Sequence, residues 1–313
     1  MKTKEYIWRG EWISEEEFEQ KINDLGKDTA DDLRLRMHLP SLLRACATYR
    51  QQLLDGDNEE LITSLTDAGN TAEHAAETIN EIIAFLDPDF LEQKIKRELG
   101  SDNPFVLHRN DFRGDAFEAW GPLGMLVHVV PGNAPTVAPL SVLEGLMSGN
   151  INVLKNSSKN GNFPQLVLKG IVDACPSGML KPFVYAFQLS SARKDTLRGI
   201  FNAAHGIAAW GGEESVASVR KMTPEGVRII DWGHRISFSY VSSKMSKDTR
   251  GLENIAYDIC VIEQQACSSP QCLYLETDNR EELLAFANSF AAVLEKVSQT
   301  FPQPEISIPE MAE

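Results

Sequence analysis

The spacing of apolar residues changes near residue 104 of the chain. Between residues 14 and 99, apolar side chains recur at helical intervals. Three segments show this spacing most clearly: 31–54, 58–68 and 71–86. Ser14 and Glu17 form a capping-box pattern at the start of the first helix. Pro40 lies inside the first segment and is expected to divide it into two helices.

After residue 104, short runs with strand character alternate with amphipathic segments. The predicted strands are 105–109, 116–120, 123–130, 151–155, 182–187, 206–210, 228–232, 236–241 and 271–276. The predicted helices are 137–147, 163–175, 194–202, 215–222 and 279–297, the last capped by Asp278. The run 123–130 is apolar almost throughout, which is typical of a parallel strand covered on both faces. The alternation predicts a doubly wound, Rossmann-like α/β sheet with right-handed crossovers.

Composition excludes several classes of protein. The 313 residues are 42% hydrophobic and 24% charged, as in an ordinary globular protein. A net charge of -15 without a basic cluster argues against nucleic-acid binding. No apolar stretch is long enough to span a bilayer, and the acidic start does not resemble a signal peptide. Five scattered cysteines without C-x-x-C spacing argue against a disulfide framework and a zinc site, so we expect a cytoplasmic protein.

Three distinctive turns follow predicted strands. They are Pro131–Asn133, Lys155–Ser158 and the pair Gly211 and Gly212. In a doubly wound sheet, ligands bind beyond the carboxyl ends of the strands, where these turns are expected to gather. Glycine allows the backbone to approach a pyrophosphate at a helix N-terminus, although a plain turn is the alternative reading of Gly211 and Gly212.

Cys267 is the candidate nucleophile. It lies shortly after an apolar segment, residues 256–262, and precedes a turn of small residues. A cysteine that opens a helix is reachable, and the helix dipole and exposed N–H groups favour its thiolate. The alternative is a small buried residue, which describes most free cysteines. We expect Cys260 and Cys272 to be core residues.

Taken in order, four segments resemble the aldehyde dehydrogenase superfamily, and within it the long-chain fatty acyl-CoA reductases of bacterial bioluminescence. The resemblance runs from about Trp120 to Glu276. The segments are Pro-Leu-Gly at 122–124 leading to Val-Pro-Gly-Asn-Ala-Pro at 130–135, Ser-Gly-Asn-Ile-Asn-Val-Leu-Lys-Asn-Ser-Ser at 148–158, Ala-Trp-Gly-Gly-Glu-Glu at 209–214, and Gln-Gln-Ala-Cys at 264–267.

The resemblance implies roles for individual residues. Cys267 would carry the acyl group as a thioester, and the Asn133 amide would donate to the oxyanion. Without the resemblance, Asn133 can also be interpreted as a turn residue that follows a glycine. The implied cofactor-binding residues are Pro131, Lys155, Ser158, Trp210, Gly211 and Gly212, with Lys155 on the adenosine ribose.

The resemblance implies NADPH as the cofactor. Ser158 stands where NAD-preferring members often carry a glutamate, so a 2′-phosphate would not be repelled, and Lys159 could attract one. The alternative interpretation of Lys159 is a solvated surface charge. Two features depart from the family pattern: Asn156 replaces a proline, and Glu213 with Glu214 would lie beside phosphate.

The implied reaction reduces a long-chain acyl-CoA, or another activated acyl group, to a fatty aldehyde. Residues 235–243 lack the glutamate that hydrolytic members use as a base, which suits an enzyme that must protect a thioester from water. His234 could relay a proton or simply bond to backbone. The expected partners are acyl-CoA or an acyl-donor protein, within a homo-oligomer or a multi-subunit complex. Reduction of an acyl phosphate and a non-catalytic docking fragment remain alternatives.

We expect three domains. Residues 1–103 form the N-terminal helical region, and residues 104–258 form the NADP-binding domain. Residues 259–313 begin a catalytic domain that is expected to be incomplete, because in the family most of that domain follows the nucleophile.

Overall fold

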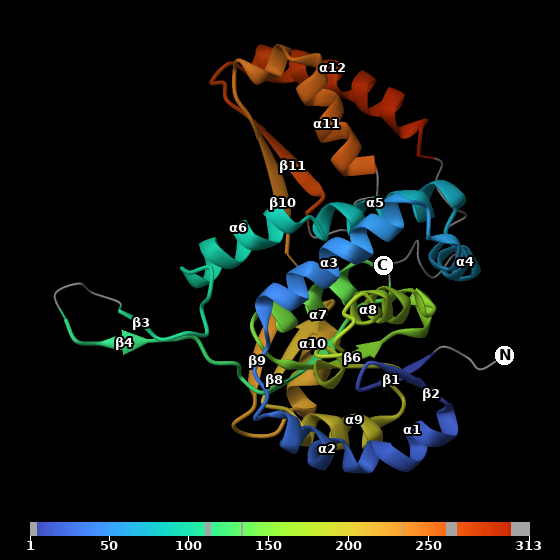
Figure 1. The fold of residues 1–313 in the computed structure, drawn as a ribbon. Helices are drawn as coiled ribbons and strands as arrows, with labels where there is room; N and C mark the ends of the chain where they lie inside the picture. Colours follow the sequence, from blue (N-terminus) through green and yellow to red (C-terminus); the bar gives the residue numbers. More distant parts are fainter. Residues whose placement is uncertain (1–4, 110–113, 133, 234, 261–267, 302–313) are drawn as a thin grey trace. The chain divides into compact units, whose positions relative to one another are not determined.

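The computed structural model describes residues 5–109, 114–132, 134–233, 235–260 and 268–301. The chain divides into two compact units, Met1–Gly233 and His234–Glu313 (Figure 1). The division into three domains made from the sequence remains a prediction. Among the described residues, no helix has both the length and the apolar character needed to cross a bilayer.

The first unit contains a seven-stranded sheet in the order β2-β1-β7-β6-β5-β8-β9. The strands are β1 Tyr6–Trp8, β2 Glu11–Ile13, β5 Met125–Val129, β6 Ile151–Asn156, β7 Val184–Gln188, β8 Gly206–Trp210 and β9 Arg228–Trp232. The five strands from β7 to β9 are parallel, which confirms the doubly wound α/β sheet. The hairpin β1–β2 adds antiparallel to the free edge of β7. The sequence analysis missed this hairpin, because strands of three residues are too short to show a period.

Four helices connect the parallel strands: α7 Val137–Met147, α8 Phe163–Asp173, α9 Lys194–Ala203 and α10 Glu213–Met222. The chain winds outward from β5 to β7 and then returns to β8 on the other side of β5. With right-handed crossovers, this return places α9 and α10 on the face opposite α7 and α8. The switch point between β5 and β8 is where doubly wound sheets bind ligands.

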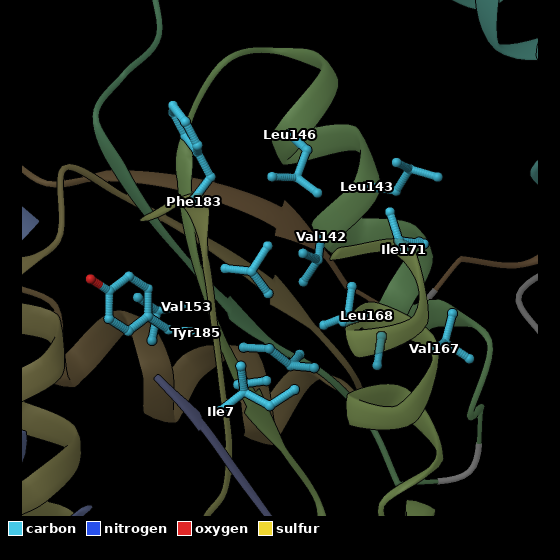
Figure 2. Close-up of a cluster of buried hydrophobic side chains, with 14 of the residues drawn as sticks. Ile7, Val142, Leu143, Leu146, Val153, Val167, Leu168, Ile171, Phe183 and Tyr185 are labelled. Atoms are coloured by element: carbon cyan, nitrogen blue, oxygen red, sulfur yellow. The ribbon is translucent and has the colours of Figure 1, made fainter. Parts of the chain in front are cut away.

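Apolar side chains from α7 and α8 fill the space above the sheet. Figure 2 shows Val142 and Leu146 of α7 and Leu168 of α8 gathered on one side of the sheet, with Val153 of β6 beside Tyr185 on the other side. All five are fully buried. Each such side chain contributes about 2 kcal/mol relative to an exposed position. The core therefore fixes β5 and β6, whose ends carry two of the three predicted ligand turns.

In the described residues before β5 there are six α-helices, which confirms the helical region that the apolar spacing predicted. They are α1 Glu15–Lys21, α2 Leu25–Asp32, α3 Leu39–Leu54, α4 Glu59–Asp67, α5 Ala72–Phe85 and α6 Pro88–Leu99. The capping box is present: Ser14 Oγ accepts from the Glu17 amide at 3.2 Å, and Glu17 Oε2 accepts from the Ser14 amide at 2.8 Å. Pro40 lies in the first turn of α3, where no amide donor is needed. Both α3 and α4 pack on α8.

The segment between α6 and β5 carries a short antiparallel pair, β3 His108–Arg109 and β4 Phe117–Glu118. Both strands are shorter than predicted. Phe117 and Leu107 are exposed, so the apolar residues that suggested longer strands have no core to pack against.

The second unit contains β10 Ser237–Val241 paired in parallel with β11 Pro270–Leu275. Its helices are α11 Thr249–Cys260, which the sequence analysis did not predict, and α12 Arg280–Ser298. Asn279, not Asp278, caps α12, because Asn279 Oδ1 accepts from the amides of Glu281 and Glu282 at 2.8 and 3.4 Å. Asp278 lies one residue too early to reach those amides.

Candidate functional site

The carboxyl ends of β5, β6 and β8 lie at one edge of the first unit's sheet. In the parallel register, Val129 pairs with both Lys155 and Ala209. The turns that begin at Pro131, Lys155 and Trp210 therefore start at the same level on three adjacent strands. This gathers Pro131, Lys155, Ser158, Trp210, Gly211 and Gly212, the predicted cofactor-binding residues, at the switch point. Asn133, His234 and Cys267 lie outside the described residues.

Lys155 is the last but one residue of β6, and only 6% of the residue is exposed. Its ammonium donates to Ser191 Oγ at 3.4 Å, a long contact to a neutral partner. Burial lowers the pKa of Lys155, because the charged form loses its hydration. A buried ammonium with one neutral partner retains donors for the oxygen atoms of a ligand.

The Asn156 side chain holds the turn that follows β6. Its side chain is fully buried, and Nδ2 donates to Gly161 O at 2.9 Å and to Gln165 Oε1 at 3.0 Å. Asn156 Oδ1 accepts from Asn160 Nδ2 at 3.1 Å. Asn160 Nδ2 also donates to Pro131 O at 2.9 Å, so this amide network ties the β6 turn to the β5 turn.

A second network of polar side chains holds Trp210. Its Nε1 donates to Ser141 Oγ at 3.0 Å, and Ser141 Oγ lies 2.7 Å from His128 Nδ1. His128 Nε2 lies 3.0 Å from Asn152 Oδ1. Because Asn152 Nδ2 donates to Asn150 O at 2.7 Å, its Oδ1 must be the acceptor from His128. This network assigns the proton of a neutral His128 to Nε2, and the Ser141 hydroxyl then donates to Nδ1.

Burial lowers the pKa of His128 to about 4, because the imidazolium would lose its hydration. The ring is therefore neutral at physiological pH, in agreement with the assigned tautomer. His128 is a positioning group for Trp210, through Ser141.

Trp210 stacks on Trp232 at the ends of β8 and β9, with ring centroids 4.8 Å apart and an interplanar angle of 11°. The outer ring, Trp232, is exposed. The Gly211 amide donates to Trp232 O at 3.4 Å, which joins the two strand ends. The stack is next to the glycine turn, so a ligand that binds there should change the tryptophan fluorescence.

The glycine turn leads into the N-terminus of α10. Gly211 has φ +144, a backbone conformation that L side chains rarely adopt. Gly212 is the N-cap without a side-chain cap, and a Cβ there would meet nothing within 4 Å. The first amides of α10 are therefore accessible to an anion. Glu213 and Glu214 are exposed, so solvent screens their carboxylates from a ligand at the turn.

The donor set fits a dinucleotide. One buried ammonium, an open helix N-terminus after glycine and an aromatic pair supply what ribose hydroxyls and a pyrophosphate require. Among the described residues, no cluster of histidine, cysteine, aspartate or glutamate could hold a metal ion.

A pocket of about 270 Å³ lies beside this edge. It is lined by Leu65, Ala68, Gly69, Asn70, Gly132, Pro135, Lys159 and Asn160. None of the predicted cofactor-binding residues lines it. Lys159 lies against Gly132, since a Cβ built on Gly132 would come within 2.9 Å of Lys159 Cβ and 2.8 Å of Ser157 Oγ.

Sequence reasoning missed several residues of the site, among them Ser141, Asn160 and Ser191. Ser191 follows β7, so the rule that pointed to the other strand ends could have found it. Ser141 is a buried hydroxyl in an otherwise apolar helix, a weak signal for a polar partner. Asn160 gave no signal, because its role depends on contacts with residues far along the chain.

The family model described as "Acyl-CoA reductase (LuxC)" matches residues 36–313. Curated relatives include a long-chain acyl-protein thioester reductase of Aliivibrio fischeri, 27% identical over 201 residues, covering 64% of this chain and 41% of the relative. The protein of the same name from Photobacterium phosphoreum is 26% identical over 214 residues, covering 67% of this chain and 43% of the relative. The chain thus spans about two fifths of the length of these relatives.

Solved aldehyde dehydrogenase structures share the fold. Aldehyde dehydrogenase 21 from Physcomitrella patens matches with a TM-score of 0.69 at 13% identity, covering 94% of this chain and 64% of that one. The NADP-dependent glyceraldehyde-3-phosphate dehydrogenase from Bacillus halodurans C-125, complexed with NADP, matches with a TM-score of 0.65 at 12% identity, covering 96% and 65%. These matches confirm the fold of the aldehyde dehydrogenase type predicted from the sequence.

Proposed function

This chain belongs to the acyl-CoA reductase (LuxC) family, and from that premise we propose that it takes part in reducing a long-chain acyl thioester to a fatty aldehyde. The relatives are named as reductases of acyl-protein thioesters, which favours an acyl-donor protein over free acyl-CoA as the source of the acyl group. The turns at the ends of β5, β6 and β8 support a reductase that binds a dinucleotide at this edge.

Cys267 is the proposed nucleophile, and Asn133 the proposed oxyanion donor. The Cys267 thiolate forms a bond to the thioester carbonyl carbon, the donor's sulfur leaves as a thiolate, and an acyl-enzyme thioester results. Negative charge develops on the carbonyl oxygen during this exchange, and a fixed amide donor stabilises it by about 3 kcal/mol. The support is the sequence pattern, Pro-Gly-Asn-Ala-Pro after β5 and Gln-Gln-Ala-Cys before β11.

NADPH is the proposed cofactor, and when bound it supplies the hydride that reduces the acyl carbon. The Lys155 ammonium would hold ribose oxygens, and Gly211, Gly212 and the first amides of α10 would hold the pyrophosphate. Ser158 is exposed and brings no carboxylate to the ribose, so a 2′-phosphate meets no repulsion there. Pro131 and Trp210 shape the two sides of the same edge.

The single observation that carries this proposal is the buried Lys155 ammonium at the switch point, whose one hydrogen-bond partner in the described part of the chain is Ser191. A lysine buried there, with no carboxylate partner among the described residues, is costly unless a ligand uses it.

Titration with NADPH and NADH, followed by tryptophan fluorescence, tests the proposal. We expect NADPH to quench the Trp210–Trp232 pair and to bind more tightly than NADH. Lys155→Met should weaken NADPH binding about tenfold, equivalent to about 1.4 kcal/mol. Lys194→Met, at the exposed start of α9, is the matched control and should bind as the unaltered chain does. A fluorescence signal that neither nucleotide changes would refute nucleotide binding at this edge.

A further inference from the structure

Trp232 is the last residue of β9, and 47% of it is exposed. One face of its indole is stacked on Trp210, with ring centroids 4.8 Å apart and an interplanar angle of 11°. The two residues are paired on neighbouring strands, so the stack runs across the sheet from β8 to β9. β9 is the outermost strand of this sheet (Figure 1), and no strand in the described part of the chain covers the other face of the Trp232 ring.

The Trp232 ring is exposed, but its position is fixed. The Trp232 carbonyl oxygen accepts from the Gly211 amide at 3.4 Å, which ties the end of β9 to the glycine turn. The Gly233 amide donates to Asp231 Oδ1 at 2.8 Å, so the main chain is held on both sides of Trp232. Stacking on Trp210 sets the plane of the indole. A planar ligand can therefore stack on the outer face without first ordering a side chain, which lowers the entropic cost of binding.

The order of the strands sets the direction in which a dinucleotide extends. Across the order β6-β5-β8-β9, Lys155 lies two strands from the glycine turn on one side, and Trp232 lies one strand away on the other. At about 4.8 Å per strand, these separations are about 10 Å and about 5 Å. In an extended dinucleotide, the two nucleosides lie on opposite sides of the pyrophosphate. With the adenosine ribose at Lys155 and the pyrophosphate at the glycine turn, the nicotinamide nucleoside extends toward the end of β9.

The chemistry of the nicotinamide ring matches this direction. An indole has an electron-rich face, which attracts cations and electron-poor rings. The nicotinamide ring is a cation in its oxidised form and neutral in its reduced form, whereas adenine is neutral in both. Stacking on Trp232 should therefore favour NADP⁺ over NADPH, and the complex with NADP⁺ should show a charge-transfer absorption band.

We propose that Trp232 binds the nicotinamide ring of the dinucleotide by stacking on it with the outer face of its indole. The inference rests on the proposed function, because it names the residue that orients the reacting ring of that cofactor. The indole covers one face of the ring, so the hydride leaves C4 of the ring from the opposite face. It passes with its electron pair to the acyl carbon, the carbonyl oxygen takes up the negative charge, and the indole stabilises the nicotinamide cation that remains.

The test is a calorimetric titration of the 313-residue chain with NADP⁺, with NADPH and with adenosine 2′,5′-bisphosphate, which lacks the nicotinamide nucleoside. Trp232→Leu removes the aromatic face. Trp120→Leu is the matched control, because Trp120 is 55% exposed and lies before β5, away from the carboxyl ends of the strands. We expect Trp232→Leu to weaken NADP⁺ binding about tenfold and NADPH binding about threefold, and to leave the bisphosphate unchanged. Trp120→Leu should bind all three ligands as the unaltered chain does.

A further variant and a spectrum separate stacking from a purely structural role. Trp232→Phe keeps a smaller aromatic ring and should recover most of the NADP⁺ affinity. The charge-transfer band with NADP⁺ should appear in the unaltered chain and in Trp120→Leu, and be absent in Trp232→Leu. A purely structural role would lower the unfolding midpoint of Trp232→Leu and leave the ratio of its NADP⁺ and bisphosphate affinities unchanged, which would overturn the proposal.

The failure of this inference and the failure of the proposed function are distinguishable. An equal loss of NADP⁺ and bisphosphate affinity in Trp232→Leu would place adenine on Trp232, and equal NADP⁺ affinities of Trp232→Leu and Trp120→Leu would show that no ring stacks there. Either result refutes the stacking of nicotinamide while dinucleotide binding stands. Lys155→Met should weaken all three ligands, because its ammonium would hold the adenosine half. An unaltered chain that binds none of the three refutes the cofactor site, and the stacking with it.

Discussion

The first unit's sheet and the second unit's two-stranded sheet bury their strands to very different extents. All six residues of β6 are buried, including the polar Asn152, Lys155 and Asn156. In the second unit, Phe238, Tyr240 and Tyr274 are exposed on β10 and β11. The hydrophobic cluster behind these strands consists of five buried residues, with partly buried neighbours: Val241, Leu252, Ala256, Ile259 and Phe290.

The difference shows which unit holds its polar side chains in defined orientations. In the first unit, polar side chains at the strand ends are buried and must satisfy one another, so each is held in one orientation. Lys155, Asn156 and His128 all have this character. In the second unit, few apolar contacts hold the strands, so we expect local opening at lower free energy.

The largest expected effect comes from removing one phenylalanine in each unit. Phe163→Ala in α8 removes a side chain that is fully buried in the main core and should lower the free energy of unfolding of the first unit by about 3–5 kcal/mol. Phe290→Ala in α12 should cost less, because its hydrophobic cluster is small. Denaturant unfolding together with segment-resolved hydrogen exchange measures both. Equal losses would contradict the comparison.

The second effect is a pH dependence from His128. Its pKa falls from 6.5 in the unfolded chain to about 4 in the folded chain, so the unfolded state binds the extra proton throughout that window. Stability should therefore fall as pH falls from about 6.5 to about 4, by about 3 kcal/mol in total.

His128→Gln should flatten this part of the stability curve. His74→Gln, on the surface helix α5, is the control and should leave it unchanged. Urea unfolding at a series of pH values gives both curves, and a dependence that survives His128→Gln would show that another group titrates.

A third change probes the close packing of α7 on β6. A Cβ on Gly145 would lie 1.8 Å from Asn152 Oδ1, so Gly145→Ala must displace the acceptor of His128. Overpacking of this kind costs about 2 kcal/mol. We expect Trp210 fluorescence to shift as well, because the network that holds its ring is disturbed. Gly199→Ala, where a Cβ would meet nothing within 4 Å, is the control. Stability equal to that of the control would show that α7 and β6 can move apart.

The smallest effects are those of two helix caps, one in each unit. Ser14→Ala and Asn279→Ala each remove a side chain that accepts from the first amides of a helix. Each should cost about 1 kcal/mol. Hydrogen exchange should rise in α1 for the first variant and in α12 for the second. Faster exchange in both helices from one substitution would contradict independent units.

The sequence predicted the parallel strands because runs such as 123–130 are short and apolar throughout. It predicted the connecting helices because segments such as 137–147 are longer and lie between turn residues. It also predicted the three turns at one edge of the sheet, because each turn follows a strand that the alternation predicts to be parallel. It missed β1–β2, whose place depends on pairing with β7, nearly 180 residues away. Asn160 and Ser141 were missed for the same reason. Their hydrogen bonds join segments that are separate in the sequence.

The central claim is that Cys267 carries the acyl group. The most direct measurement is intact-protein and peptide mass spectrometry after incubation with a long-chain acyl donor, for the unaltered chain, Cys267→Ala and Cys272→Ala. The expectation that Cys272 is a core residue was wrong: it is an exposed thiol on β11, which makes it the matched control. We predict one acyl adduct on the unaltered chain and on Cys272→Ala, its loss in Cys267→Ala, and its release as aldehyde when NADPH is added. An adduct that persists in Cys267→Ala, or that disappears in Cys272→Ala, would contradict the account.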